Sequence, residues 1–198
     1  MFLALAFILL AVPATCQPAT STPAPAPAAG RDDEAFVRGC CARTLYPRVC
    51  TASLAPYAAA VNSSNARLAV ASANLTFDTI TSLGGRIPSS STAVSSSTGA
   101  LQDCVEAVAS AAGLAARAAE RLGGVERAVG PEVAWRVSDA RTWLSAAMTY
   151  EDTCADALRP ARSVPSPVRA ELRAGVRRAM QHTSIALALV HMLVRTGA

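Results

Sequence analysis

Apolar residues recur along the chain at steps of three and four, the spacing of one face of an α-helix. One seam within 100–122 consists of Leu101, Val105, Val108, Ala112, Ala115, Ala119 and Leu122. A second seam within 131–158 consists of Val133, Val137, Ala140, Leu144, Ala147, Cys154 and Leu158, and it is interrupted where Glu151 falls on it. Beyond residue 31, no segment alternates with a period of two over more than a few positions. The pattern therefore predicts an all-α protein.

Two further helices are predicted on either side of these seams. One spans about 57–83, with an inward set of Val61, Leu68, Ala71, Leu75, Phe77 and Ile80. The other spans 166–196, with a wetter face bearing Arg169, Arg173 and Arg177 and with Val168, Leu172, Val176, Met180, Leu187, Val190 and Val194 directed inward. The connections at 84–99, 123–131 and 159–167 are rich in Gly, Ser and Pro. We therefore expect one domain at 31–198, in which a helical hairpin at 31–55 precedes an up-down-up-down four-helix bundle.

The first thirty residues have the pattern of a signal peptide followed by a leader, which predicts that the protein is secreted. Residues 1–12 are apolar and uncharged, too short to span a membrane but as long as the apolar core of a signal peptide. Cleavage after Ala14 and cleavage after Cys16 both fit the small-residue rule, which gives a signal peptide within 1–16. Residues 17–30 alternate Pro with Ala, Ser and Thr, as in an extended leader. We expect a secreted protein in an oxidising compartment.

The composition limits how the bundle can be held together. Hydrophobic residues make up 52% of the chain but aromatic residues only 5%, and alanine is the main seam residue. Alanine lets helix axes approach closely but buries little apolar area. Such a core is expected to depend on covalent cross-links. All 18 basic residues are arginine and the net charge is +4, but the arginines form no compact patch along the chain, so nucleic-acid binding is not indicated.

The cysteines fall at positions that favour disulfides. Cys41 and Cys50 bracket a turn signal, so their thiols would meet across a short hairpin. Cys104 and Cys154 lie on the two seams, at helix ends that coincide in antiparallel packing. Cys40 is left over, either as a free buried thiol or as a partner of Cys16 if cleavage follows Ala14. No pair of Cys-x-x-Cys motifs occurs, so a metal site is not expected.

Nothing in the sequence indicates an enzyme. His182 and His191 both lie in the last predicted helix, and neither a Gly-x-Ser-x-Gly elbow nor a Gly-rich phosphate loop occurs. We expect His191 to be a partly buried structural side chain and expect no cofactor. A helical carrier of lipid would need a cavity, which alanine seams close.

Four motifs occur in a diagnostic order: CARTLYPRVC at 41–50, ALQDC at 100–104, WLSAAMTYEDTCAD at 143–156 and TSIALALV at 183–190. From about Asp32 to the C-terminus, the chain resembles the plant invertase and pectin methylesterase inhibitor family. The resemblance implies disulfides between Cys41 and Cys50 and between Cys104 and Cys154. It also implies a secreted inhibitor, located in the apoplast or cell wall, whose partner is a plant enzyme.

The family includes inhibitors of two kinds of enzyme. Characterised invertase inhibitors of the family resemble one another in a Pro-Lys-Phe segment between the second and third bundle helices, where this chain has GPEVA at 130–134. The segment at 143–154 is closer to the esterase-inhibitor form. The resemblance therefore favours inhibition of pectin methylesterase. The alternatives are inhibition of cell-wall or vacuolar acid invertase, and a member with neither activity.

The resemblance also implies candidate partner-binding residues. In the resembled esterase inhibitors, the second and third bundle helices block the enzyme's pectin-binding cleft near the long-range disulfide. The matching positions are Glu106, Thr153 and Asp156, with Thr149 and Asp152 as further candidates. Thr149, Asp152 and Asp156 fit a solvated acidic helix end equally well. We expect a reversible complex of one inhibitor with one enzyme.

Two further expectations concern the surface. The sequons that begin at Asn62 and Asn74 predict N-glycosylation of the first bundle helix. The net charge of +4 favours weak association with acidic pectin.

Overall fold

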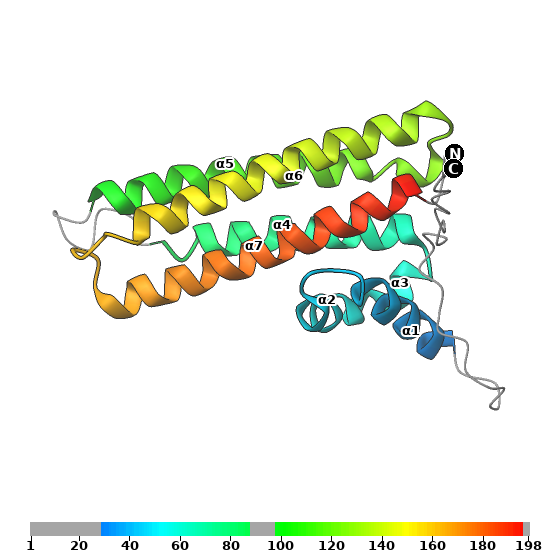
Figure 1. Ribbon diagram of the computed structural model, residues 1–198, viewed down its shortest axis with the longest axis horizontal. Coiled ribbons are helices and arrows are strands. Elements are labelled where there is room, and N and C mark those ends of the chain that lie inside the picture. Colours follow the sequence, from blue (N-terminus) through cyan, green and yellow to red (C-terminus); the bar gives the residue numbers. More distant parts are fainter. Residues whose placement is uncertain (1–28, 88–97, 196–198) are drawn as a thin grey trace, which may run out of the picture.

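The computed structural model describes residues 29–87 and 98–195, and all the regular structure within them is helical. Consecutive long helices run antiparallel, and the last packs against the first to close a bundle (Figure 1). The four helices are α4 (Asn65–Gly84), α5 (Thr98–Leu122), α6 (Pro131–Leu158) and α7 (Ser166–Arg195). The predicted four-helix bundle is therefore confirmed. The predicted signal peptide, with Cys16, and nearly all of the predicted leader lie outside the described residues.

The starts of α6 and α7 follow from local sequence. Gly130 has a φ of +57°, which glycine adopts without steric cost, and Pro131 then occupies the first turn of α6. Pro167 likewise follows Ser166 at the start of α7. Between α5 and α6, a 3-10 turn, η2 (Val125–Arg127), makes the connection. Both helices begin where the sequence predicts them.

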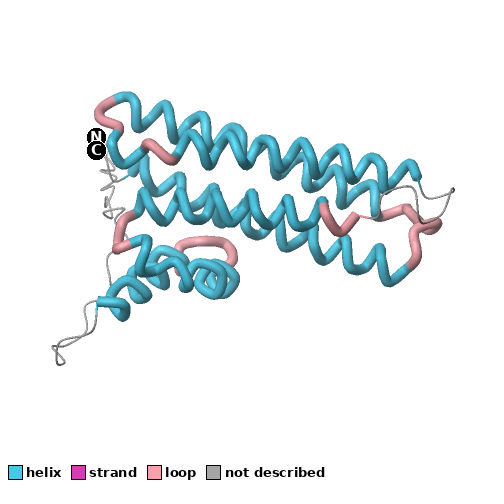
Figure 2. The backbone as a smooth tube through the Cα atoms, turned by 180° about the vertical axis from the view of Figure 1, so that it is seen from behind, coloured by secondary structure: helices cyan, strands magenta, loops and turns pink. Residues whose placement is uncertain are grey.

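A smaller helical unit packs against one end of the bundle, beside α4 and α7 (Figure 2). It consists of α1 (Ala29–Cys41), α2 (Pro47–Leu54), a 3-10 turn η1 (Ala55–Tyr57) and α3 (Ala58–Val61). Its buried residues form one cluster with residues of α4 and α7, among them Phe36, Val37, Leu54, Leu68, Ile185 and Leu189. The predicted hairpin is thus packed into the hydrophobic core of the protein.

The prediction of one continuous helix at 57–83 is wrong, because the helix is interrupted between α3 and α4. Asn62 and Ser63 have φ values of 47° and 51°, the left-handed conformation that asparagine tolerates better than most residues. Ser64 then caps α4, because its Oγ accepts a hydrogen bond from the backbone N–H of Arg67 at 3.3 Å. Apolar periodicity on both sides of the break concealed it.

Most of the predicted inward residues are buried, eight are half-buried and two are exposed. Val105 is 38% exposed because its neighbour Cys104 takes the seam position. Val194, near the end of α7, is also exposed. Ala71 and Leu75 are half-buried against the small helical unit, because α4 packs on that unit as well as on the bundle.

Two disulfides hold this alanine-rich core. Cys41 is joined to Cys50 across the α1–α2 turn, and Cys104 at the start of α5 is joined to Cys154 near the end of α6. These are the pairings that the family resemblance implies. Cys40 is also disulfide-bonded, so it is not a free thiol. None of the helices in the described part of the chain is both long and apolar enough to cross a membrane.

The buried histidine of α7 is His182, and His191 is exposed, contrary to the prediction. The ring of His182 hydrogen bonds with Ser53 Oγ of α2 at 3.1 Å and with Thr79 Oγ1 of α4 at 2.7 Å. Burial, and secondarily the charge of Arg178, lowers the pKa of His182. This side chain therefore ties the small helical unit to the bundle.

Candidate functional site

A shallow groove runs along the outer surface between α5 and α6, at the end of the bundle that holds the long-range disulfide. We call it the α5/α6 groove. It is lined by Asp103, Glu106, Ala107, Ser110, Tyr150, Thr153 and Ala157. It therefore brings together two of the predicted partner-binding residues, Glu106 and Thr153, which are far apart in the sequence.

The disulfide and the helix period explain this meeting. Glu106 follows Cys104 by two residues and Thr153 directly precedes Cys154, so the bond that joins the cysteines fixes the register of the two helices. The buried faces of α5 and α6 meet at the disulfide, and the flanking positions turn outward. Both side chains are exposed.

The hydrogen bonds of these residues stay within their own helices. Glu106 Oε1 accepts a hydrogen bond from Gln102 Nε2 at 2.7 Å. Thr153 Oγ1 donates to the carbonyl oxygen of Thr149 at 2.9 Å, and Thr149 Oγ1 donates to that of Ser145 at 3.2 Å. The carboxylate and both hydroxyl oxygens retain lone pairs that face solvent, so they could accept hydrogen bonds from a partner.

The other three predicted residues lie outside the groove. Thr149, Asp152 and Asp156 are exposed on α6 and do not line it. Asp156 forms an ion pair with Arg159 at 2.6 Å, and both side chains are largely exposed. Such a pair contributes little to stability. These residues border the groove without forming it.

Sequence reasoning missed three polar residues of the groove: Asp103, Ser110 and Tyr150. Their spacing could have revealed them. Asp103 and Ser110 lie three residues before and four residues after Glu106, and Tyr150 lies three residues before Thr153. Residues at these spacings share one face of a helix.

The groove lies on an acidic part of the surface. Asp103 and Glu106 occur in 98–116 of α5, and Asp152 and Asp156 occur in 142–158 of α6; neither segment contains an arginine. A partner that covers this surface must supply basic groups or hydrogen-bond donors, because a carboxylate buried without them is destabilising. No group of His, Cys, Asp and Glu side chains within 29–87 and 98–195 is arranged to hold a metal ion.

A buried carboxyl group lies on the inner face of α6, one turn before Cys154. Glu151 has no exposed surface and continues the seam that it was expected to interrupt. Its Oε1 accepts a hydrogen bond from Thr183 Oγ1 of α7 at 2.6 Å, while its Oε2 has no partner. Desolvation raises the pKa of Glu151 to about 7, and the hydrogen bond from Thr183 opposes this effect in part. The group is therefore protonated in mildly acidic solution.

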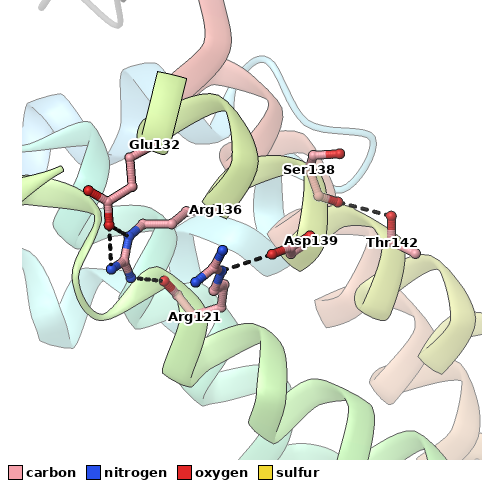
Figure 3. A network of polar contacts seen from close by, with 6 residues as sticks. All are labelled: Arg121, Glu132, Arg136, Ser138, Asp139 and Thr142. Carbon is pink, nitrogen blue, oxygen red and sulfur yellow. Dashed lines mark hydrogen bonds and ion pairs between the residues drawn. The ribbon is translucent and has the colours of Figure 1, made fainter. Parts of the chain in front are cut away.

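The opposite end of the α5–α6 pair uses its polar side chains within the fold (Figure 3). Arg136 of α6 pairs with Glu132 at 2.7 Å and donates through Nη1 to the carbonyl oxygen of Arg121, near the end of α5, at 2.9 Å. Arg121 in turn pairs with Asp139 of α6 at 2.9 Å. Gly124 leaves room for this arrangement, because a Cβ at that position would lie 2.7 Å from Arg136 Nη1.

Comparison with known proteins identifies relatives along most of the chain. Pectinesterase inhibitor 10 of Arabidopsis thaliana is 30% identical over 168 residues, which make up 81% of this chain and 52% of that protein. This chain therefore spans about half the length of that relative. Pectinesterase inhibitor 11 of the same plant is 29% identical over 164 residues, which make up 81% of each protein.

The fold has a counterpart among solved structures. The crystal structure of a mutant form of a pectin methylesterase inhibitor from Arabidopsis matches 77% of this chain with a TM-score of 0.60 and 24% sequence identity. The family model described as plant invertase/pectin methylesterase inhibitor matches residues 35–189, which include the small helical unit from within α1 and nearly all of the bundle. The protein therefore belongs to the plant invertase/pectin methylesterase inhibitor family.

Proposed function

We propose that this protein is a secreted inhibitor of plant pectin methylesterase and that its α5/α6 groove docks against the pectin-binding cleft of the enzyme. The observation that carries the proposal is the convergence of Glu106 and Thr153 in one exposed groove beside the Cys104–Cys154 disulfide. Relatives with the printed name pectinesterase inhibitor support the choice of target.

The inhibition would be reversible and would involve no chemistry on the inhibitor. A complex of one inhibitor with one enzyme at a standard interface buries about 1,600 Å² in total. The disulfide supports such binding because it fixes the spacing of α5 and α6 before the enzyme arrives, so little conformational freedom is lost on docking. Thr149, Asp152 and Asp156 would lie at the rim of this interface.

Export to the apoplast and N-glycosylation are parts of the same proposal. Asn62 and Asn74 are exposed, as glycosylation requires. Asn74 of α4 lines a different hollow, together with Leu75 of α4 and Tyr57 of η1, so a glycan there would leave the α5/α6 groove open. In the cell wall, the protein would also associate weakly with acidic pectin, because its net charge is +4.

The direct test is to mix the purified protein with a plant pectin methylesterase and titrate the acid released from methyl-esterified pectin. We expect a dose-dependent loss of esterase activity. Thr153→Arg should abolish most of the inhibition, because it places a bulky charged group at the centre of the groove.

Thr142→Arg is a matched control for this variant. Thr142 is also exposed on α6, and its Oγ1 likewise donates to the carbonyl oxygen four residues earlier, at 3.0 Å. It lies about three turns nearer the start of the helix and does not line the groove, so inhibition should be retained. Full esterase activity at micromolar inhibitor, with inhibition of acid invertase instead, would overturn the proposed target. Equal losses in the two arginine variants would overturn the proposed site.

A further inference from the structure

The first half of α7 presents a positively charged face that the fold does not neutralise. Arg173, Arg177 and Arg178 are exposed, and none of them forms an ion pair with an acid in the described part of the chain. Glu171 is the only acid in the sequence of α7, and it too lacks an ion pair there. Arg173 and Arg177 lie four residues apart, a spacing at which like charges repel. The face is therefore favourable for an external anion.

A fourth arginine packs against α7 from the segment after α4, but it lies outside this face. Arg86 follows α4 and is exposed. Gly175 has no side chain, and a Cβ built there would lie 3.0 Å from Arg86 Nη2, so the guanidinium lies against α7. Arg173 and Arg177 lie two residues before and after the buried Gly175, so they project from the other side of α7. We therefore call the three exposed arginines of α7, Arg173, Arg177 and Arg178, the arginine face.

Another arginine of α7 contrasts with those of the arginine face, because its side chain is hydrogen bonded within the fold. Arg169 also lies on α7, but its Nη1 donates to the carbonyl oxygens of Ala161 at 2.7 Å and Val164 at 3.4 Å. That guanidinium is used to fold the connection between α6 and α7. Arg173, Arg177 and Arg178 make no such bond to the residues that the structure describes, so their donors remain available to a ligand.

The arginine face and the α5/α6 groove lie on opposite sides of the bundle. The groove lies between α5 and α6, whereas the arginine face lies on α7, across the bundle. The small helical unit covers the other half of α4 and α7 and leaves the first half of α7 uncovered (Figure 1). A protein bound in the acidic groove would therefore leave the arginine face open to solvent.

We propose that the arginine face binds the carboxylates of a linear polyuronate, the polymer that a pectin methylesterase exposes when it removes methyl esters. The identity of the polymer rests on the proposed function, whereas the anionic character of the ligand rests on the charge of the face. A guanidinium presents a planar pair of donors that matches a carboxylate, and a methyl ester carries no charge to match. The inhibitor would thus be held on de-esterified polymer while its groove engages the enzyme.

The test is retention of the full chain on immobilised polygalacturonate and on highly methyl-esterified pectin, without any esterase present. We expect retention on polygalacturonate that weakens as salt is added, because exposed charges are screened. The triple variant Arg173→Gln/Arg177→Gln/Arg178→Gln should bind at least about fivefold more weakly, because three exposed charge pairs are removed. Inhibition of the esterase on a soluble substrate should be unchanged.

Arg48→Gln/Arg127→Gln/Arg141→Gln is the matched control. These arginines are exposed on α2, η2 and α6, and their replacement changes the net charge by the same amount. Retention of this variant should stay within about twofold of the unmodified protein. Equal losses in both triple variants, equal retention on esterified pectin, or no retention of the unmodified chain would each overturn the inference.

The inference and the proposed function can fail separately. Retention that depends on the arginine face, in a protein that inhibits no esterase, would support polyuronate binding and overturn the proposed function. Esterase inhibition without retention on polygalacturonate would support the proposed function and overturn polyuronate binding.

Discussion

The two ends of the α5–α6 pair are held together in different ways. At one end the Cys104–Cys154 disulfide joins the helices, and the exposed polar side chains beside it, Glu106 and Thr153, bond only within their own helices. At the other end, Arg121 and Arg136 make the polar contacts between the helices. A covalent bond thus frees the neighbouring side chains for a partner, whereas the end without one uses them for folding.

Removal of the Cys104–Cys154 disulfide should have the largest effect on stability. Replacing both Cys104 and Cys154 with Ala should lower the free energy of unfolding by about 4 kcal/mol, because the unfolded chain regains the freedom of a 50-residue loop. Urea unfolding followed by circular dichroism would measure this loss. Esterase inhibition should fall as well, since the two walls of the groove would no longer be fixed.

The Cys41–Cys50 pair provides the control for loop length. Its cysteines are separated by 9 residues, so the double alanine variant should lose about 3 kcal/mol and keep its groove intact. A larger loss from this pair than from Cys104–Cys154 would contradict the expected dependence of stabilisation on loop length.

The carboxyl groups of the two ends should also differ in pH dependence. Glu151, near the disulfide, is buried without an arginine partner, and its pKa is raised from 4.5 to about 7. The folded protein therefore holds this proton more tightly than the unfolded chain does. Its contribution to stability is complete below pH 4.5 and is lost as the pH rises to about 7, a change of about 3 kcal/mol.

Glu151→Gln should remove this slope, because the amide keeps an acceptor for Thr183 and does not titrate. The free energy of unfolding, measured between pH 4 and 8 in steps of about 1 pH unit, would reveal the difference between the variant and the unmodified protein. Asp152→Asn is the control, since Asp152 is the exposed neighbour on the same helix and its replacement should preserve the slope. A slope that survives in Glu151→Gln would show that another group is responsible.

The polar network at the opposite end should have the smallest effect. Arg136→Met should lower the free energy of unfolding by about 1 kcal/mol, because the carbonyl oxygen of Arg121 loses its donor and a partly exposed ion pair is lost. Arg141→Met, an exposed arginine on the same helix, should change stability by less than about 0.5 kcal/mol. A loss in Arg136→Met as large as that of the disulfide variant would erase the distinction between the two ends.

Much of the fold was predictable because its signals are local. The bounds of α6 were predicted from its seam and from Pro131, and the end of α5 from the glycines that follow Leu122. The break at Asn62 and Ser63 was not predicted, because apolar spacing does not report a left-handed residue. The burial of Glu151 was missed for a related reason: a carboxyl group on a seam is ordinarily read as an interruption, and only the neutral form and Thr183 make it tolerable.

The candidate site was also predictable from the sequence in part only. The order of motifs and the cysteine positions in the sequence are enough to indicate the family, the bundle and the residues near the long-range disulfide, because these depend on spacing along single helices. Tertiary structure alone decided that Glu106 and Thr153 share one groove with Asp103 and Tyr150, and that the small helical unit leaves the arginines of α7 uncovered on the opposite side of the bundle. Both arrangements depend on how helices pack across the bundle, and helix packing brings together residues that no local pattern connects.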